Sequence, residues 1–372
     1  MNSLKNNQLA DKPELEDTRI YYSDEIARRA VGRLFDELDD VLANDNKPTV
    51  GEALVMSGKE TLMRPFKAIT RIKGITQIKV IGVGSAGSNI VDKMIHENIK
   101  GIEFIAVNTD KNELSESAAE QKIQIGSEFT RILGAGGDPA MGRRAAEMSG
   151  EDIADSLKNA DMAFIVAGLG GGTGTGAAPV IAAIAKEMGI LTIGVVTKPF
   201  AFEGRLRMRK AEAGILELKK SIDTLIIIPN QRLFEIGKID KNLSQHVRDI
   251  SDLIAKPGKI TLDFADIHTI MSDKGVAYVG VGRASGKNRA EEAAQIAIGT
   301  PLTEASINGA KSMLVSISGD DSSELADIDA AMNIIRKFVS PEAEILFGIT
   351  INDDLEDEIV ITVIATDLAG EY

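Results

Sequence analysis

The sequence predicts an α/β protein, in which a parallel sheet is covered by helices on both faces and followed by a smaller α+β domain. Apolar runs rich in β-branched residues alternate with helical stretches from residue 77 to 228, which is typical of strands buried on both faces of a parallel sheet. Shorter strands and helices alternate again after about residue 261. The expected strands are 77–82, 103–107, 161–167, 191–196, 224–228, 275–281, 312–318, 343–350 and 358–364, and the expected helices are 88–97, 177–188, 288–298 and 323–338.

Composition divides the chain into four parts. Residues 1–70 form an N-terminal extension whose polar start is expected to be partly disordered and whose remainder is helical. We expect this extension to pack on the main domain, with docking to a partner or to a membrane surface as alternatives. Residues 71–235 hold the parallel sheet, 236–260 a connecting helix, and 261–372 the C-terminal α+β domain.

Composition and charge exclude several classes of protein. The chain has 372 residues and is 44% hydrophobic, which suits two compact domains. A net charge of -14 disfavours nucleic acid as a partner. The absence of Cys excludes disulfides and thiolate metal sites, and three widely separated His predict no metal held by protein side chains. No apolar run reaches the ~20 residues that span a bilayer, and no signal peptide is recognisable, so we expect a cytoplasmic protein.

The first glycine loop follows the strand at residues 77–82. Its sequence, Gly82 to Gly87, matches G-x-G-x-x-G and opens a helix. Such glycines let the backbone approach a diphosphate, while the helix N-terminus supplies amide donors. Alone the motif is weak, because it fits a Rossmann-like dinucleotide site, a mononucleotide site or a simple tight turn.

The second glycine loop is more specific. Six glycines occupy the nine positions from Gly168 to Gly176, between a strand and a helix. A structural turn needs one or two, so this density indicates a loop whose amides form an anion nest. Thr173 and Thr175 add hydroxyl groups.

A third loop, Gly134 to Pro139, is expected between a strand and a helix. Three loops at the carboxyl ends of strands in one sheet converge on one crevice. The P-loop pattern G-x-x-x-x-G-K-[ST] is absent from the sequence, so amides and helix dipoles are expected to hold the phosphates.

These segments resemble those of a known family. The run 168–179 is similar to the signature loop of the tubulin/FtsZ superfamily, and the other segments are similar to FtsZ, the prokaryotic cell-division GTPases. The resemblance extends from Ile78 to Ala365 and implies the tubulin/FtsZ fold, with a Rossmann-like GTPase domain, a central helix and a C-terminal domain. The segments that carry it are 82–89, 108–110, 134–139, 168–179, 199–207, 228–230 and 262–266.

The resemblance implies a role for each matching residue toward GTP or GDP. Phosphate contacts come from the segments 82–89 and 108–110, γ-phosphate sensing from 134–139, the diphosphate wrap from the signature loop, and ribose and guanine contacts from later segments. In that order the residues are Gly84, Ser85, Ala86, Asn89 and Asp110; Gly136 and Gly137; Gly170, Gly171, Gly172, Thr173, Gly174 and Thr175; and Glu203, Arg207 and Asn230.

The resemblance also implies a shared active site in a head-to-tail homopolymer. Asp263 and Asp266 would enter the nucleotide pocket of the next subunit and polarise the attacking water. At the same time Asp263 can cap a helix, and Asp266 can be a first-turn acid that the helix dipole stabilises. Mg2+ is expected, held mainly by phosphate and water. The implied protein is a GTP-hydrolysing cytoskeletal filament former for cell division and septation, with a membrane-adaptor partner whose site the sequence does not assign.

The central helix departs from the family pattern. Between Asn230 and Asp263 the only helical stretch is 242–256, about 22 Å long, which is shorter than the resemblance implies. Asp240 and Asn242 are candidates for reading the base, and the chain stops at Tyr372 without a counterpart of the family's adaptor-binding tail. The alternative is therefore a divergent FtsZ-like scaffold that binds nucleotide, hydrolyses little of it and has a non-division role.

An NAD(P)-dependent oxidoreductase is a third hypothesis. The loop Gly82 to Gly87 and Asp110 motivate it, because a ribose-binding acid is expected about twenty residues after such a loop. The glycine run from Gly168 to Gly176 has no place in that scheme.

Overall fold

The computed structural model describes most of the chain after residue 75. All described residues belong to one compact unit, Lys73–Tyr372. The predictions for residues 1–70, for the helix 242–256 and for Asp263 lie outside the described residues. Those described are 76–97, 99, 101–130, 134–235, 264–299, 303–320, 323, 325–352 and 355–368.

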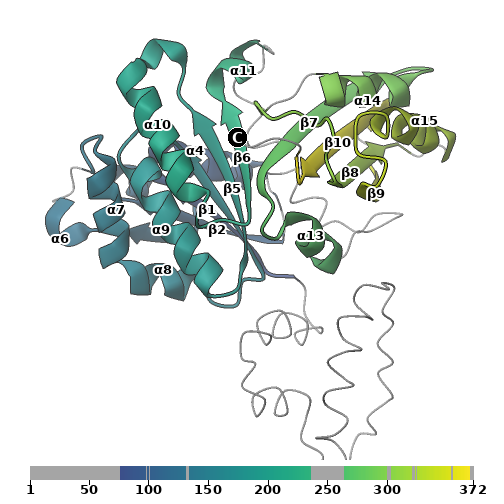
Figure 1. Cartoon of the computed structure of the whole chain (residues 1–372). Coiled ribbons are helices and arrows are strands. Elements are labelled where there is room, and N and C mark those ends of the chain that lie inside the picture. The colour runs from purple at the N-terminus through teal and green to yellow at the C-terminus, as the bar shows by residue number, and fades with distance from the viewer. Residues whose placement is uncertain are drawn as a thin grey trace, which may run out of the picture. The chain divides into compact units, whose positions relative to one another are not determined.

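The strands form one ten-stranded sheet in the order β3-β2-β1-β4-β5-β6-β7-β10-β8-β9 (Figure 1). The first seven strands of this order are mutually parallel. The strands span β1 Ile78–Val83, β2 Ile102–Asn108, β3 Gln121–Gln124, β4 Met162–Gly168, β5 Leu191–Lys198, β6 Thr224–Pro229, β7 Gly275–Ser285, β8 Ser312–Gly319, β9 Glu344–Ile351 and β10 Glu358–Thr366.

Helices cover both faces of the parallel sheet. One face packs against α4, α5 and α13 around a core that includes Val91, Leu114 and Ile267, and the other packs against α7, α8, α9 and α10. Their apolar faces are buried against strands that are themselves apolar on both sides, as a parallel sheet requires. The helices are α4 Gly84–His96, α5 Lys111–Glu116, α6 Ser127–Thr130, α7 Pro139–Met148, α8 Gly150–Ser156, α9 Thr173–Glu187, the 3-10 turn η2 Ala201–Glu203, α10 Arg205–Leu218, α11 Asn230–Glu235 and α13 Phe264–Met271.

Strand β7 joins the parallel sheet to the C-terminal domain. Its first residues pair with β6 in parallel, from Thr224 opposite Gly275, and the rest of the strand pairs with β10 in antiparallel. Helices α14 (Arg289–Gly299) and α15 (Leu325–Ile335) cover this part of the sheet around a third core. The predicted α/β sheet followed by a smaller α+β domain is therefore confirmed, whereas the four domain boundaries remain predictions.

Three local features differ from the sequence-based expectations. The short strand β3 was not predicted, because its sequence, Gln-Lys-Ile-Gln, has one apolar residue. Helix α9 begins at Thr173, inside the glycine run and four residues before the predicted start at 177. The third glycine loop does not follow a strand directly, since α6 lies between β3 and Gly134.

The direction of the strands decides where a ligand can bind. Because β1, β2 and β4 are parallel, the loops that follow Val83, Asn108 and Gly168 gather at the carboxyl edge of the sheet. Among the described residues, no helix is long and apolar enough to cross a membrane.

Candidate functional site

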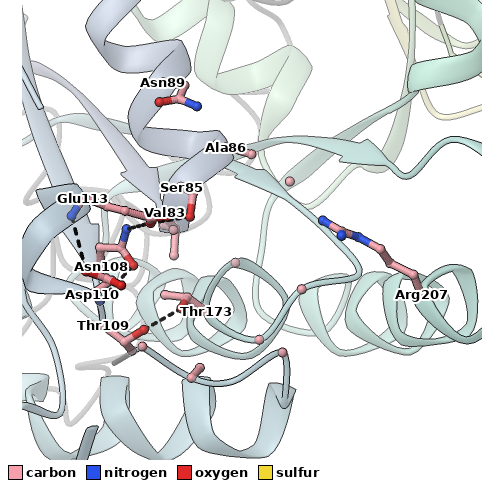
Figure 2. A pocket seen from close by; sticks show the side chains of 18 residues that line it. Val83, Ser85, Ala86, Asn89, Asn108, Thr109, Asp110, Glu113, Thr173 and Arg207 are labelled. Carbon is pink, nitrogen blue, oxygen red and sulfur yellow. Dashed lines mark hydrogen bonds between the residues drawn. The ribbon is translucent and has the colours of Figure 1, made fainter. Parts of the chain in front are cut away.

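A cavity of about 490 Å³ opens at the carboxyl ends of β1, β2 and β4 (Figure 2). This volume lies within the range of sites for small ligands and cofactors. All three glycine loops reach it, as the sequence predicts. Of the sixteen residues expected to bind nucleotide, those that line the cavity are Gly84, Ser85, Ala86, Asn89, Asp110, Gly137, Gly171, Gly172, Thr173, Gly174 and Arg207.

Five of the expected nucleotide-binding residues do not line this cavity. Gly136 lies beside Gly137 in the third loop. Gly170 donates its amide to Thr175 Oγ1 at 2.7 Å, so this pair shapes the signature loop from within. Glu203 Oε2 forms an ion pair with Arg207 Nε at 3.0 Å and thereby holds a side chain that does line the cavity. Asn230 opens α11 at the end of β6, on the same edge of the sheet.

Two helices begin at the cavity without a side chain that caps their first backbone amides. Neither α4 nor α9 has a side-chain cap or an acidic residue in its first turn. By contrast, α5 is capped by Asp110, which accepts from the amides of residues 112 and 113, and α7 is capped by Asp138. Because uncapped amides and the helix dipole favour negative charge, the ends of α4 and α9 are suited to phosphate.

Most glycines of the signature loop are required by close contacts within the protein, which leave no room for a Cβ. A Cβ at Gly172 would lie 2.9 Å from the amide nitrogen of Asp138, and one at Gly176 would lie 2.0 Å from the carbonyl oxygen of Pro139. These contacts let α7 and α9 pack closely beside the cavity. Gly171 differs, because a Cβ there would meet nothing within 4 Å and its backbone has no positive φ. Contacts within the described part of the chain therefore do not require glycine at position 171, which lines the cavity.

A carboxylate that the sequence analysis missed joins two of the loops. Glu113 Oε2 accepts from Asn108 Nδ2 at 2.9 Å and also from Ser85 Oγ. The D-x-x-E spacing of Asp110 and Glu113 is a recognisable helix-start signal. The acid does not complete that capping pattern here but instead reaches into the cavity (Figure 2).

A hydrogen bond also joins the segment 108–110, which follows β2, to the signature loop. Thr109 Oγ1 and Thr173 Oγ1 lie 2.7 Å apart (Figure 2). Asn108 and Thr109 belong to a segment that carries the family resemblance, which assigns them no role. In the structure Thr109 ties this segment directly to the signature loop, whereas Asn108 shares the carboxylate of Glu113 with Ser85 of the first loop.

The charge of the cavity is slightly negative. Among the described residues that line it, Arg207 is the one cationic side chain, whereas Asp110 and Glu113 are carboxylates. Figure 2 shows Arg207 on the far side of the cavity from Glu113. An anionic ligand would therefore meet main-chain amides and little cationic charge from the described side chains.

The predicted catalytic acid Asp266 lies at the other edge of the sheet. It belongs to α13, and Met271 at the end of that helix accepts a hydrogen bond from Thr224, the first residue of β6. Figure 1 shows α13 and α11 at opposite ends of β6. Asp266 therefore does not belong to the cavity of its own subunit. Within the described part of the chain, no group of three or more potential ligand side chains is placed to hold a metal.

Comparison with known proteins agrees with this fold and site. The model for the GTPase domain of the tubulin/FtsZ family matches residues 77–238, and the model for the C-terminal domain of the FtsZ family matches residues 275–369. The protein is thus of the class that joins a tubulin-type GTPase domain to a smaller C-terminal domain. A structure described as an empty FtsZ dimer from M. jannaschii is 37% identical, with a TM-score of 0.74 over 83% of this chain and 92% of that one. The chain belongs to the tubulin/FtsZ family, and its C-terminal domain is of the FtsZ type.

More distant relatives share the fold. CetZ1 from Haloferax volcanii, described as a GDP-bound monomer, is 20% identical, with a TM-score of 0.67 over 79% of this chain and 95% of that one. CetZ2 from the same organism, described as a GTPγS-bound protofilament, is 20% identical, with a TM-score of 0.66 over 78% of this chain and 92% of that one. The tubulin/FtsZ fold is therefore common to FtsZ and CetZ proteins and to this chain.

Proposed function

We propose that this protein binds GTP and GDP in the cavity, assembles head to tail into cytoskeletal filaments, and hydrolyses GTP where two subunits meet. This proposal rests on one observation, which is that the cavity and the acid Asp266 lie at opposite edges of the sheet. The cavity lies at the carboxyl edge of the parallel sheet, whereas Asp266 lies at the amino edge.

The cavity favours a nucleotide over other ligands of similar size. Two uncapped helix N-termini and three glycine loops offer main-chain amides on one side, and Arg207 with its partner Glu203 lies on another. Amides suit the phosphates, while the segment with Glu203 and Arg207 is expected at the ribose and Asn230 near the guanine. A cofactor with one phosphate would leave much of this amide surface unused.

Mg2+ fits the charge of the cavity. A triphosphate beside Asp110 and Glu113 meets repulsion that Arg207 only partly offsets. A divalent cation on the phosphates would remove that repulsion and stabilise the charge that develops during phosphoryl transfer. We propose that phosphate and water supply most of its ligands, since too few carboxylates converge on the cavity.

Head-to-tail assembly would bring the two edges together. A neighbouring subunit that presents its α13 to the cavity would complete the site with Asp266 and, by family resemblance, Asp263. An interface between two different surfaces that does not close into a ring gives an open filament. The related FtsZ described as a dimer and the CetZ2 described as a protofilament support self-association as part of this proposal. We further propose a cytoplasmic role in cell division, with a membrane-adaptor protein as partner.

Mixing two inactive variants tests the shared site. Asp266→Ala removes the acid but keeps the cavity, whereas Gly171→Ala disturbs the cavity but keeps the acid. Each variant alone should lose GTP turnover. In a random equimolar mixture, about a quarter of the junctions would pair an intact cavity with an intact acid, so turnover should recover to about a quarter of the wild-type value.

The control mixture combines two cavity variants, Gly171→Ala with Arg207→Ala, and should recover nothing. If the Asp266→Ala protein hydrolyses GTP at the wild-type rate, or if its mixture with Gly171→Ala stays inactive, the proposed shared site is wrong.

A scaffold with little hydrolysis is the second candidate. Neither family model matches residues 239–274, the stretch that holds Asp263 and Asp266. Filaments that retain bound GTP, with phosphate release near background, would favour this alternative and a non-division role. Turnover that rises with protein concentration would exclude it.

A further inference from the structure

The helix that carries Asp266 is fastened at its carboxyl end by two threonines from different domains. Thr224 opens β6 of the parallel sheet and Thr366 closes β10 of the C-terminal domain, and both are fully buried. Thr224 Oγ1 donates to the carbonyl oxygen of Met271, and Thr366 Oγ1 donates to that of Ile270 at 2.8 Å. Carbonyls in the last turn of a helix have no partner within the helix, so these hydroxyls fix where α13 ends.

The two aspartates adjacent to these threonines hold the turn that follows α13. The carbonyl oxygen of Asp223 accepts from the amides of Lys274 and Gly275, both at 2.9 Å. On the other side, Asp367 Oδ2 lies 2.5 Å from Lys274 Nζ. Each domain therefore contributes one Asp-Thr pair, and the two pairs hold α13 and its following turn from opposite sides.

The body of α13 is packed on the core of the sheet beside these anchors. Ile267, Ile270 and Met271 are fully buried in the core beneath the helix. Asp266 lies one turn before Ile270 on the same side of this eight-residue helix. A displacement at the carboxyl end of α13 is therefore transmitted directly to the carboxylate, and that displacement depends on β6 and β10 together.

We propose that Thr224 and Thr366 are positioning residues that set how Asp266 is presented to the neighbouring subunit, so that hydrolysis at the junction responds to the relative position of the two domains. This inference rests on the proposed shared site. Neither threonine lines the cavity of its own subunit. Their loss should therefore leave nucleotide binding intact and impair turnover, because a misplacement of about 1 Å at a reacting group can reduce a rate about 100-fold.

Valine and serine variants separate the hydroxyl from the shape of the side chain. Thr224→Val and Thr366→Val keep the volume but remove the donor, whereas Thr224→Ser and Thr366→Ser keep the donor. Thr269→Val is the matched control, because Thr269 lies on the same helix, is exposed, and donates within the helix to Ala265 at 2.9 Å. Nucleotide affinity, filament mass and GTP turnover per subunit are measured for each variant, after thermal unfolding shows that it is folded.

We expect the two valine variants to bind nucleotide and assemble like the wild type but to turn over GTP at least about tenfold more slowly. The serine variants and Thr269→Val should retain most of the wild-type rate. Mixing Thr224→Val with Gly171→Ala should restore turnover to about a quarter of the wild-type value, since the cavity of the first then meets the acid of the second. Loss of stability alone would not produce this recovery.

The inference is wrong if both valine variants turn over GTP normally while Asp266→Ala is inactive. It is also wrong if the Gly171→Ala subunits fail to rescue Thr224→Val although they rescue Asp266→Ala. If the Thr224→Val protein does not fold, the same comparison is made with Thr366→Val. A wild-type protein without GTP turnover would instead refute the proposed function, so the two failures are distinguishable.

Discussion

Lys186 Nζ lies 2.6 Å from Asp273 Oδ1 and thereby joins the carboxyl end of α9 to the turn that follows α13. The same ammonium group lies 3.1 Å from Asp223 Oδ1. Helix α9 begins at Thr173 in the cavity, so one rigid element extends from the phosphate loops to the base of the acid-bearing helix. The two edges of the sheet are thus connected within one subunit, although the reaction is proposed to occur between subunits.

The first prediction concerns the pH dependence of this ion pair. Burial acts to lower the pKa of Lys186, but hydrogen bonds and charges from Asp273 and Asp223 outweigh it and raise the pKa. The hydrogen bond from Lys186 lowers the pKa of Asp273, against a smaller opposing effect of desolvation. The stabilisation from Asp273 is therefore present above its ordinary pKa of 3.8 and lost as pH falls through the lowered value. The stabilisation from Lys186 is present below 10.5 and lost as pH rises through the raised value.

Lys186→Met should accordingly reduce the free energy of unfolding by about 0.5–1 kcal/mol at neutral pH, since solvent screens this partly exposed pair, and the difference should narrow at both extremes of pH. Urea unfolding of both proteins from acid to alkaline pH measures it. Lys158→Met is the control, because Lys158 forms an exposed pair with Asp155 at 2.7 Å. A difference that stays constant down to the most acidic pH at which both proteins fold would contradict the assignment.

The second prediction separates ligand-related from structural glycines. Gly171→Ala adds a methyl group where the protein leaves open space, so the free energy of unfolding without nucleotide should change by less than about 0.5 kcal/mol. Affinity for GDP should fall at least about tenfold, because the methyl group occupies a position on the cavity lining. Calorimetric titration and thermal unfolding with and without GDP measure both quantities.

Gly176→Ala is the contrasting variant. Its Cβ would lie 2.0 Å from the carbonyl oxygen of Pro139, which belongs to the backbone of another helix. The helices must then move apart, and we expect destabilisation by about 3 kcal/mol even without nucleotide. Equal effects of the two variants on stability would show that Gly171 is also structural.

Periodicity and strand patterning predict most of this fold because they report burial directly. The strands β1, β4 and β5 are mostly apolar and buried almost throughout, as is typical of strands covered on both faces. The crevice follows from strand direction alone, since loops after parallel strands gather at one edge. The number of glycines is weaker support for a ligand than the sequence suggests, because the close approach of α7 and α9 explains several of them.

Two features of the site depend on tertiary contacts that no local pattern reports. Glu113 resembles a helix-start acid in the sequence, and its bond to Asn108 becomes apparent only when β2 and α5 are placed together. The place of Asp266 at the amino edge depends on how α13 meets β6, which lies more than thirty residues earlier in the chain. The sequence therefore predicts which acidic side chains matter better than it predicts where they lie in the structure.

The third prediction concerns Thr175. The sequence suggests a hydroxyl donor for phosphate, whereas the structure shows its Oγ1 accepting from the amide of Gly170 at 2.7 Å. Thr175→Val should therefore leave a buried amide without its acceptor and loosen the signature loop before any nucleotide binds. Hydrogen exchange of the Gly170 amide in nucleotide-free protein should accelerate, and Thr175→Ser should restore protection. Acceleration confined to the nucleotide-bound protein would instead favour a direct phosphate contact.

The last prediction concerns Glu113 and the metal. Its carboxylate orders Ser85 and Asn108 but also adds negative charge beside the expected phosphates. Glu113→Gln keeps the length and shape of the side chain, and one of its amide atoms can still accept from Asn108. Without Mg2+ the variant should bind GTP more tightly than the wild type, because one repulsive charge is gone. Adding Mg2+ should therefore strengthen binding less in Glu113→Gln than in the wild type, by about threefold to tenfold, since the cation has less charge to offset.

Titrations of both proteins with GTP in EDTA and in excess Mg2+ give this ratio. Glu116→Gln, on the same helix but outside the cavity lining, is the control. If Mg2+ improves the affinity of both proteins equally, Glu113 does not contribute to the metal dependence, and the cation acts on the phosphates independently of this carboxylate.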